Sequence, residues 1–179
     1  ILEAFEDLPT DQIVILPNNK NILMAARQAV DLTVKAVRVI PTVSVPQGIA
    51  AMLTLEPNAE LDALARSMED LIDEVRTGEI TTSTRDVEID GIEVKKGQVI
   101  GLLDQKLVFS GDDLEEVVFR VREEGCVDDS ELITLYVGCT YPMEEARTLA
   151  EKIQEKHSDQ EIEVIEGGQP HYQLILSIE

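Results

Sequence analysis

Two short apolar runs on either side of a helical stretch constrain the fold of this chain more than any other feature. The runs "IVIL" (13–16) and "AVRVI" (36–40) have the length and composition of buried strands. Between them, apolar residues recur at helical spacing over 22–33, and either Asn18 or Asn19 can cap that helix. A strand–helix–strand unit requires a right-handed crossover, so the sequence predicts a parallel strand pair covered by helices.

Two more helices are predicted before the pattern changes. Ser44 is a plausible N-cap for the first of them, and Pro46 is tolerated in its first turn. The second runs from Ala59 to Arg76 with apolar residues at helical spacing throughout, and Gly78 is expected to end it as a C-cap glycine. We expect the apolar face of this helix, Leu71 included, to pack in the core.

From Glu79 onward, apolar residues alternate with polar ones, which is the period of a β-strand. Turn signals within this alternating stretch predict antiparallel hairpins. These signals are Asp90-Gly91, Lys96-Gly97 and Asp104-Gln105.

A helix and a second strand–helix–strand unit are predicted to follow. Ser110 or Asp112 can cap the helix, and an acidic loop around Asp128 leads into the unit and a final strand. We therefore expect an α/β fold of two lobes, with mainly parallel sheets and one antiparallel hairpin segment. The expected lobes are 1–80 and 81–179. The chain begins without methionine, so we also expect that it belongs to a longer protein and that the first lobe lacks its start.

The charge balance excludes several classes of partner. The chain holds 36 acidic and 15 basic residues, a net charge of −21, which repels nucleic acid and anionic lipid. It has no apolar run near the roughly 20 residues that a membrane span needs, and no signal peptide at its start. We expect a cytoplasmic protein. Its acidity has two interpretations, a solvated surface or a docking face for a basic partner protein.

Motifs for catalysis or metal binding are missing from the sequence. Residues 86–91 imitate the start of a calcium loop, but Gly97 stands where that loop needs a glutamate. Cys126 and Cys139 belong to no CxxC pair, and neither His157 nor His171 has an evident catalytic partner. The sequence contains no phosphate-binding loop, nucleophile elbow or zinc motif. We therefore predict no catalytic residue, metal or cofactor in this chain.

Four loops remain as candidate binding surfaces. In an open parallel sheet, ligands and partners collect at the carboxyl ends of strands, which is where "PNNKN" (17–21), "PTVSVPQG" (41–48), "GCTYP" (138–142) and "EGGQPHY" (166–172) are expected. Their polar residues are neutral or positive, and their glycines permit close backbone approach. Simple turn and cap chemistry is the alternative. The residues singled out are Asn18, Asn19, Lys20, Gln47, Gly48, Gly167, Gly168 and Gln169.

Four longer stretches carry a family resemblance. "ILPNNKNILMAARQAV", "RVIPTVSVPQGIAAM", "TGEITTSTRDVEIDGIEVKKGQVIGLLD" and "EGGQPHYQLILSIE" closely resemble the C-terminal region of bacterial dihydroxyacetone-kinase-like proteins, the ATP-binding subunit of fatty acid kinase. The resemblance covers nearly the whole chain and adds Pro46 and Pro170 to the residues that match family motifs. His171 and Cys139 match no fixed family residue, so no role is carried onto them.

The resemblance implies that catalysis and partner binding are carried out by different domains. In that family an N-terminal kinase domain binds ATP and magnesium, a middle domain follows, and the C-terminal region has a DegV-like α/β fold. That region engages a separate DegV-type protein, which carries the fatty acid whose carboxylate is phosphorylated. This chain lacks the kinase domain, so we expect it to be inactive alone. The alternative is a small-ligand domain that binds dihydroxyacetone, a fatty acid or an acyl phosphate between the lobes.

Overall fold

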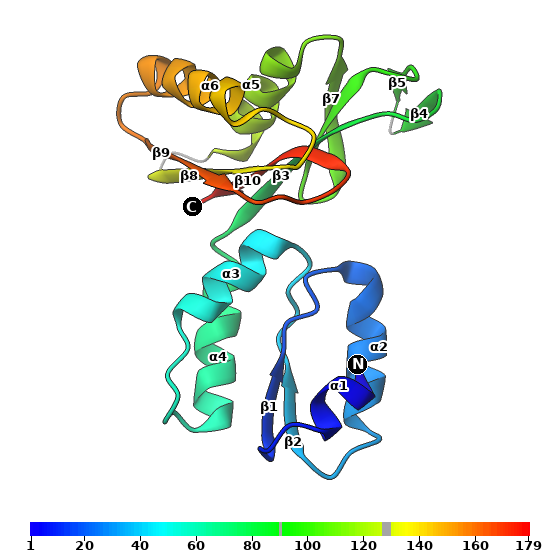
Figure 1. Ribbon diagram of the computed structural model, residues 1–179, viewed down its shortest axis with the longest axis vertical. Helices are drawn as coiled ribbons and strands as arrows, with labels where there is room; N and C mark the ends of the chain where they lie inside the picture. Colours follow the sequence, from blue (N-terminus) through cyan, green and yellow to red (C-terminus); the bar gives the residue numbers. More distant parts are fainter. Residues whose placement is uncertain (90, 127–129) are drawn as a thin grey trace. The chain divides into compact units, whose positions relative to one another are not determined.

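The computed structural model describes residues 1–89, 91–126 and 130–179. The chain forms two compact units, Ile1–Val75 and Arg76–Glu179 (Figure 1). The division falls before the expected boundary at residue 80, because the strand that begins at Arg76 belongs to the sheet of the second unit. Asp90 and Asp128, assigned above to a hairpin turn and an acidic loop, lie outside the described residues.

The first unit is built around one parallel strand pair, as the strand–helix–strand pattern predicts. β1 and β2 pair in register from Gln12 opposite Ala36 to Ile15 opposite Val39. Asn19 caps the intervening helix and Ser44 caps the next one. The elements are α1 (Leu2–Glu6), β1 (Gln12–Ile15), α2 (Lys20–Val30), β2 (Ala36–Val39), α3 (Val45–Leu53) and α4 (Leu61–Ile72).

Helices cover both faces of this strand pair. On one face, Phe5 of α1 and Ala29 of α2 share a buried cluster with Ile13 and Val37. On the other face, a second cluster contains residues of α3, α4 and the partly buried Val14. Figure 1 shows α1 and α2 on one side of the strands and α3 and α4 on the other.

Helix α4 is shorter than its apolar periodicity predicts. Glu60 caps it, and it ends at Ile72, so the prediction that Gly78 closes it is wrong. Gly78 instead lies in β3, where an added Cβ would stand 2.8 Å from Cγ1 of Val121. The glycine is therefore needed for the close approach of a helix to the sheet and not for a helix end.

The second unit contains a six-stranded sheet in the order β7-β6-β3-β10-β8-β9 and a separate β4–β5 hairpin. Its elements are β3 (Arg76–Thr82), β4 (Val87–Ile89), β5 (Ile92–Val94), β6 (Val99–Leu103), β7 (Lys106–Gly111), α5 (Leu114–Gly125), β8 (Leu132–Val137), α6 (Met143–Lys156), β9 (Glu161–Glu166) and β10 (Tyr172–Ile178). Asp113 caps α5, where the sequence suggested Ser110 or Asp112.

The α/β class is confirmed, but this sheet is mixed and not mainly parallel. Among the strands of this sheet that the structure describes, only β8 and β9 pair in parallel, and the predicted crossover through α6 joins them. The last strand, β10, runs antiparallel to both β3 and β8 and lies between them. Its apolar sequence fills the centre of the sheet, with Leu174 and Leu176 fully buried.

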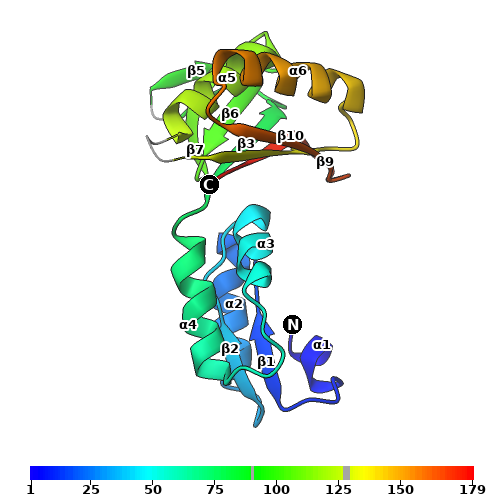
Figure 2. The same cartoon turned by 90° about the vertical axis from the view of Figure 1, so that its left-hand side faces the viewer.

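Helices α5 and α6 lie together on one face of the six-stranded sheet, as Figure 2 shows. Their apolar residues, including Val117, Val121 and Ile153, share one buried cluster with Ile133 and Leu176 of the sheet. This cluster is the core of the second unit.

Candidate functional site

The loop that follows β1 begins the first candidate surface. Asn19 has extended backbone, and its side chain accepts a hydrogen bond of 2.8 Å from the backbone N–H of Asn21, which starts α2 in the predicted way. Lys20 is the first residue of the helix. Both Asn19 and Lys20 are exposed, so they are available to a partner.

Asn18 packs inward against a neighbouring helix. Its backbone lies in the left-handed region at φ 51°, and its N–H donates to Oγ1 of Thr42 at 3.0 Å. An added Cβ on Gly48 would stand only 2.2 Å from Oδ1 of Asn18. That Oδ1 atom is buried and accepts no hydrogen bond among the described residues. The contact requires glycine at position 48 and joins the loop to α3.

Gln47 connects the start of α3 to the end of α4. Its Oε1 accepts from the N–H of Val43 at 2.9 Å, and its Nε2 donates to the carbonyl of Ile72 at 3.2 Å. Pro46 is buried in the same turn. Gln47 thereby fixes the loop before α3 against the end of α4.

Helix α3 exposes apolar side chains that the sequence alone does not single out. Its nine residues include no charged one, in a chain in which 28% are charged. Four of them form what we call the α3 stripe: Val45 (48% exposed), Ile49 (38%), Met52 (48%) and Leu53 (78%). Helical periodicity could not identify them, because it does not tell which apolar positions a neighbour covers.

The second candidate surface lies at the carboxyl ends of β8 and β9. The N–H groups of Gly167 and Gly168 both donate to the carbonyl of Val137, at 3.0 and 2.9 Å. An added Cβ on Gly138 would stand 1.9 Å from the carbonyl oxygen of Tyr172, so only glycine fits there. The loops "GCTYP" and "EGGQPHY" are therefore packed against each other.

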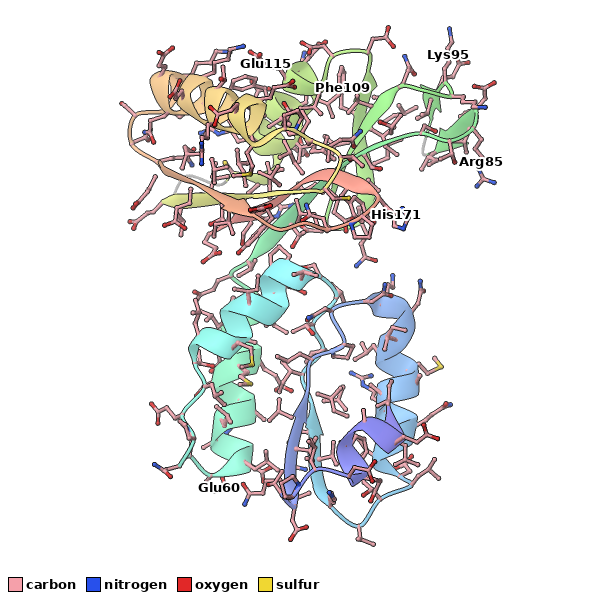
Figure 3. All side chains as sticks on the ribbon, in the orientation of Figure 1. Glu60, Arg85, Lys95, Phe109, Glu115 and His171 are labelled. Atoms are coloured by element: carbon pink, nitrogen blue, oxygen red, sulfur yellow. The ribbon has the colours of Figure 1, made fainter. Side chains whose placement is uncertain are left out.

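Gln169 ties these two loops together. Its Nε2 donates to the carbonyl of Tyr136 at 2.8 Å, and its own carbonyl accepts from the N–H of Cys139 at 3.1 Å. Pro170 and His171 remain exposed at the edge of this pair of loops, where Figure 3 labels His171. His171 adopts φ 76°, and its carbonyl accepts a hydrogen bond from Oγ1 of Thr81.

The phenol beside these loops stays protonated at neutral pH. Burial raises the pKa of Tyr172 above its ordinary value, and the negative charge of Glu79 raises it further. Burial also raises the pKa of Glu79, with a further contribution from Asp104. Tyr172 lies on β10, Glu79 on β3, and Asp104 in the turn between β6 and β7.

The structure thus brings the four predicted loops together as two pairs. Each pair is closed by a glycine contact, at Gly48 in the first unit and at Gly138 in the second. Among the ten predicted residues, half are exposed and the others pack within their own unit. The exposed residues are Asn19, Lys20, Gly167, Gly168 and Pro170.

An acidic groove of about 420 Å³ lies between α5 and α6. Its charged residues include Asp113 and Glu115 near the start of α5, and Figure 3 labels Glu115 on that helix. Lys152 forms an ion pair with Glu115 inside it. The acidic lining suits a cationic group better than the carboxylate of a fatty acid.

Metal-binding clusters and membrane-spanning helices are absent from residues 1–89, 91–126 and 130–179. Within these ranges no group of three or more His, Cys, Asp or Glu side chains is placed to hold a metal ion. Asp86, from the calcium-loop imitation, accepts a hydrogen bond of 2.7 Å from the N–H of Lys96 through Oδ1. No described helix is long and apolar enough to cross a membrane.

Solved structures similar to this chain share its fold at low sequence identity. The Fatty Acid Kinase B3 protein of Streptococcus pneumoniae, loaded with linoleic acid, matches with a TM-score of 0.68 and 11% identity over 99% of this chain and 74% of its own. The DegV family protein Cg2579 of Corynebacterium glutamicum matches with a TM-score of 0.68 and 14% identity over 98% and 76%. These matches confirm the predicted DegV-like fold.

The family is shown by sequence. An uncharacterized protein of Staphylococcus aureus (strain MRSA252) is 38% identical over all 179 residues, which make up 33% of its length, so this chain spans about a third of that relative. The family model for the C-terminal region of FakA-like fatty acid kinase proteins matches residues 1–179. The chain belongs to this family of FakA-like C-terminal domains.

Proposed function

We propose that this chain is the docking domain of the ATP-binding subunit of a cytoplasmic fatty acid kinase. It holds a DegV-type fatty-acid-binding protein so that a kinase domain elsewhere in the parent chain, with ATP and Mg²⁺, phosphorylates the acyl carboxylate for phospholipid metabolism. Membership of the FakA-like family and the DegV-like fold support this assignment. The chain's own residues bind and orient the partner, and the phosphoryl transfer occurs outside residues 1–179.

The α3 stripe is the observation that carries the proposal. Exposed apolar side chains on an uncharged helix are typical of a protein–protein contact surface. The stripe is joined to the Asn18 loop, because Asn18 packs on Gly48 in the same helix. Exposed Lys20 adds a positive charge to this loop, in a protein whose net charge is −21. The apolar side chains of the α3 stripe are buried against the partner, and the charge of Lys20 orients the partner on this surface.

The packing of the second unit leaves no space for an acyl chain beneath α5. Added Cβ atoms on Gly101 and Gly125 would stand 2.3 Å from Cγ2 of Val121 and 2.5 Å from Cδ1 of Ile178. The space between α5 and the sheet is therefore filled by side chains of the core. A fatty acid has no room in that layer without a rearrangement of the core.

Titration calorimetry of the lipid-loaded DegV-type partner against this chain tests the proposal. Ile49→Asp places a charge in the α3 stripe and should weaken binding by at least about tenfold. The matched control is Ile89→Asp on β4, since Ile89 is 37% exposed against 38% for Ile49. Thermal melts of both variants check folding.

The outcomes are distinct. Weaker binding by Ile49→Asp alone, with similar melting temperatures for both variants, supports docking through the α3 stripe. Equal affinities for the wild type and both variants would remove α3 from the interface. No heat or complex with any of the three proteins would reject the docking function of this chain.

A further inference from the structure

The edge strand β9 leaves one side of the six-stranded sheet without a neighbouring strand. The sheet ends at β9, which pairs only with β8 among the strands that the structure describes. Figures 1 and 2 both show β9 at the edge of the sheet, beneath α6. At the opposite edge, Oγ of Ser110 in β7 donates to the carbonyl of Glu93 in β5 at 3.3 Å, so the β4–β5 hairpin lies against that strand. The outer side of β9 is open to a further strand.

The backbone of β9 has unused donors and acceptors along this edge. The N–H of Glu161 donates to the carbonyl of Glu131 at 2.8 Å, on the side of β8. Because the backbone groups of successive strand residues point alternately to the two sides, those of Ile162 and Val164 point away from β8. An edge of this kind is a template on which an extended segment of another chain forms a strand.

A groove of about 380 Å³ lies beside this edge, between β9 and α6. Its lining combines apolar side chains with two acids and one amide. The lining residues are Ala150, Glu151, Gln154, Glu155 and Ile162. The side chains of an added strand would alternate between this groove and the other face of the sheet. The surface beside the edge is therefore shaped to receive side chains.

The charges around the edge favour a basic segment. Five exposed glutamates lie on β9 and on the neighbouring part of α6, and none of them forms an ion pair with another described residue: Glu151, Glu155, Glu161, Glu163 and Glu166. Lysine and arginine have long aliphatic stems that can lie on Ile162 while their charges reach these carboxylates. Ile165, which is 43% exposed, adds apolar area on the other face of the strand.

A second copy of this chain is a poor occupant of the edge. Two β9 strands paired edge to edge would bring their glutamates together, and like charges opposite each other across a strand pair are destabilising. The glutamates therefore oppose self-association through β9. They leave the backbone groups of the edge available to a strand of opposite charge.

We propose that the outer edge of β9 binds an extended segment, rich in lysine or arginine, of a separate protein. The backbone of this segment pairs with that of Ile162 and Val164, and alternate side chains enter the groove beside α6. Part of the net charge of −21 then acts as a docking face for a basic partner. The site uses no residue of the α3 stripe or of the Asn18 loop, so it is independent of the docking proposed above.

Amide hydrogen exchange, followed residue by residue in the full-length parent protein, tests the proposal. The probe is a short synthetic peptide that alternates lysine with valine. At saturating peptide, exchange at Ile162 and Val164 should slow by at least about tenfold, whereas Glu163 and Ile165, whose N–H groups face β8, serve as internal references. Binding without slower exchange at Ile162 and Val164 would reveal attraction by net charge alone and would overturn the proposal, as would no binding.

Two controls separate backbone pairing from attraction between charges. The same peptide with methylated amide nitrogens keeps its charge but cannot donate, so it should bind at least about tenfold more weakly. In the protein, Glu151→Gln with Glu155→Gln should weaken binding about fivefold more than Glu69→Gln with Glu74→Gln, which removes the same charge at exposed positions of the first unit. Equal affinities for the two peptides, or equal losses in the two double variants, overturn the proposal.

Exchange in the absence of the peptide shows whether the edge is free. Rapid exchange of Ile162 and Val164 at every protein concentration supports the proposal. Slow exchange at every concentration would mean that the parent protein itself covers the edge, and slow exchange that is lost on dilution would assign the edge to a second copy. Either of these two results overturns the proposal. The assay contains no DegV-type partner, so its failure is separable from failure of the proposed function.

Discussion

Nη1 of Arg122, on α5, lies 2.7 Å from Nε2 of His157 at the end of α6. Because a guanidinium can only donate, His157 accepts this hydrogen bond through an unprotonated nitrogen. Burial lowers the pKa of His157 from its ordinary value of 6.5, and the charge of Arg122 lowers it further. Asp159 and Glu123 oppose this shift, and Lys156 adds to it.

The free energy of unfolding should therefore fall as the pH drops below about 6.5. A histidine with a lower pKa in the folded state binds a proton more readily when unfolded. Its contribution to stability is present above the unfolded pKa and is lost as the pH falls through that value toward the folded pKa. His157→Gln keeps an acceptor and removes the titration. The free energy of unfolding, measured by urea denaturation at about pH 7.5 and at about pH 5.5, should differ less between the two pH values for this variant than for the wild type. The same change in the free energy of unfolding between the two pH values in both proteins would contradict the prediction.

Met68 is predicted to be the most sensitive position of α4. It is fully buried in the cluster that contains Ile40 and Ile72, so Met68→Ala should cost about 2 to 5 kcal/mol in urea unfolding. The exposed neighbour Glu69 provides the control, since Glu69→Ala should stay within about 0.5 kcal/mol of the wild type. A cost for Met68→Ala no greater than the control would show that the cluster can collapse around the change.

The same helix shows what its sequence could and could not predict. Spacing placed Leu64, Met68 and Ile72 on the buried face, and the structure confirms it. Leu71 shares the spacing but is only half-buried, because no neighbouring element covers that side fully. Gly78 is the residue type that commonly follows a helix end. In the structure it lies in β3, where the close packing of Val121 requires a glycine. A glycine can satisfy either requirement, so sequence alone cannot distinguish them.

Strand order is the other feature that the sequence could not supply. Turn residues such as Asp104 and Gln105, both with positive φ, predicted the β6–β7 hairpin correctly because that pairing is local. Nothing local indicates that β10 lies between β3 and β8. For the same reason the four loops could be predicted as strand ends, but their pairing through Gly48 and Gly138 depends on long-range packing.

Gly48 and Asn18 should be energetically coupled. Gly48→Ala places a Cβ about 2 Å from Oδ1 of Asn18, which should cost about 1 to 3 kcal/mol in the wild-type background. Asn18→Gly removes that side chain, and glycine adopts the positive φ of this position readily. The cost of Gly48→Ala should therefore fall by about 0.5 to 3 kcal/mol in the Asn18→Gly background.

Urea unfolding of the four proteins in this cycle measures the coupling directly. Equal costs of Gly48→Ala in the two backgrounds would show that Asn18 moves away without penalty. The loop would then not be held by this contact. Binding of the DegV-type partner by the same four proteins would show whether the position of the loop also matters for docking.

Lys20→Glu should weaken docking while leaving the melting temperature almost unchanged. Asn19 as a cap accounts for one polar residue of the loop, but a cap does not require an exposed lysine beside it. An exposed charge adds little to stability, so any loss of affinity would report contact with the partner. The measurement is titration calorimetry with the lipid-loaded DegV-type protein, at low and at high salt.

Lys95→Glu, at an exposed position in the second unit, changes the net charge of −21 by the same amount and controls for long-range steering. If both variants lose the same affinity for the partner, and high salt abolishes that loss, the effect is due to the overall charge. A fall in melting temperature for Lys20→Glu alone would assign the loop a structural role.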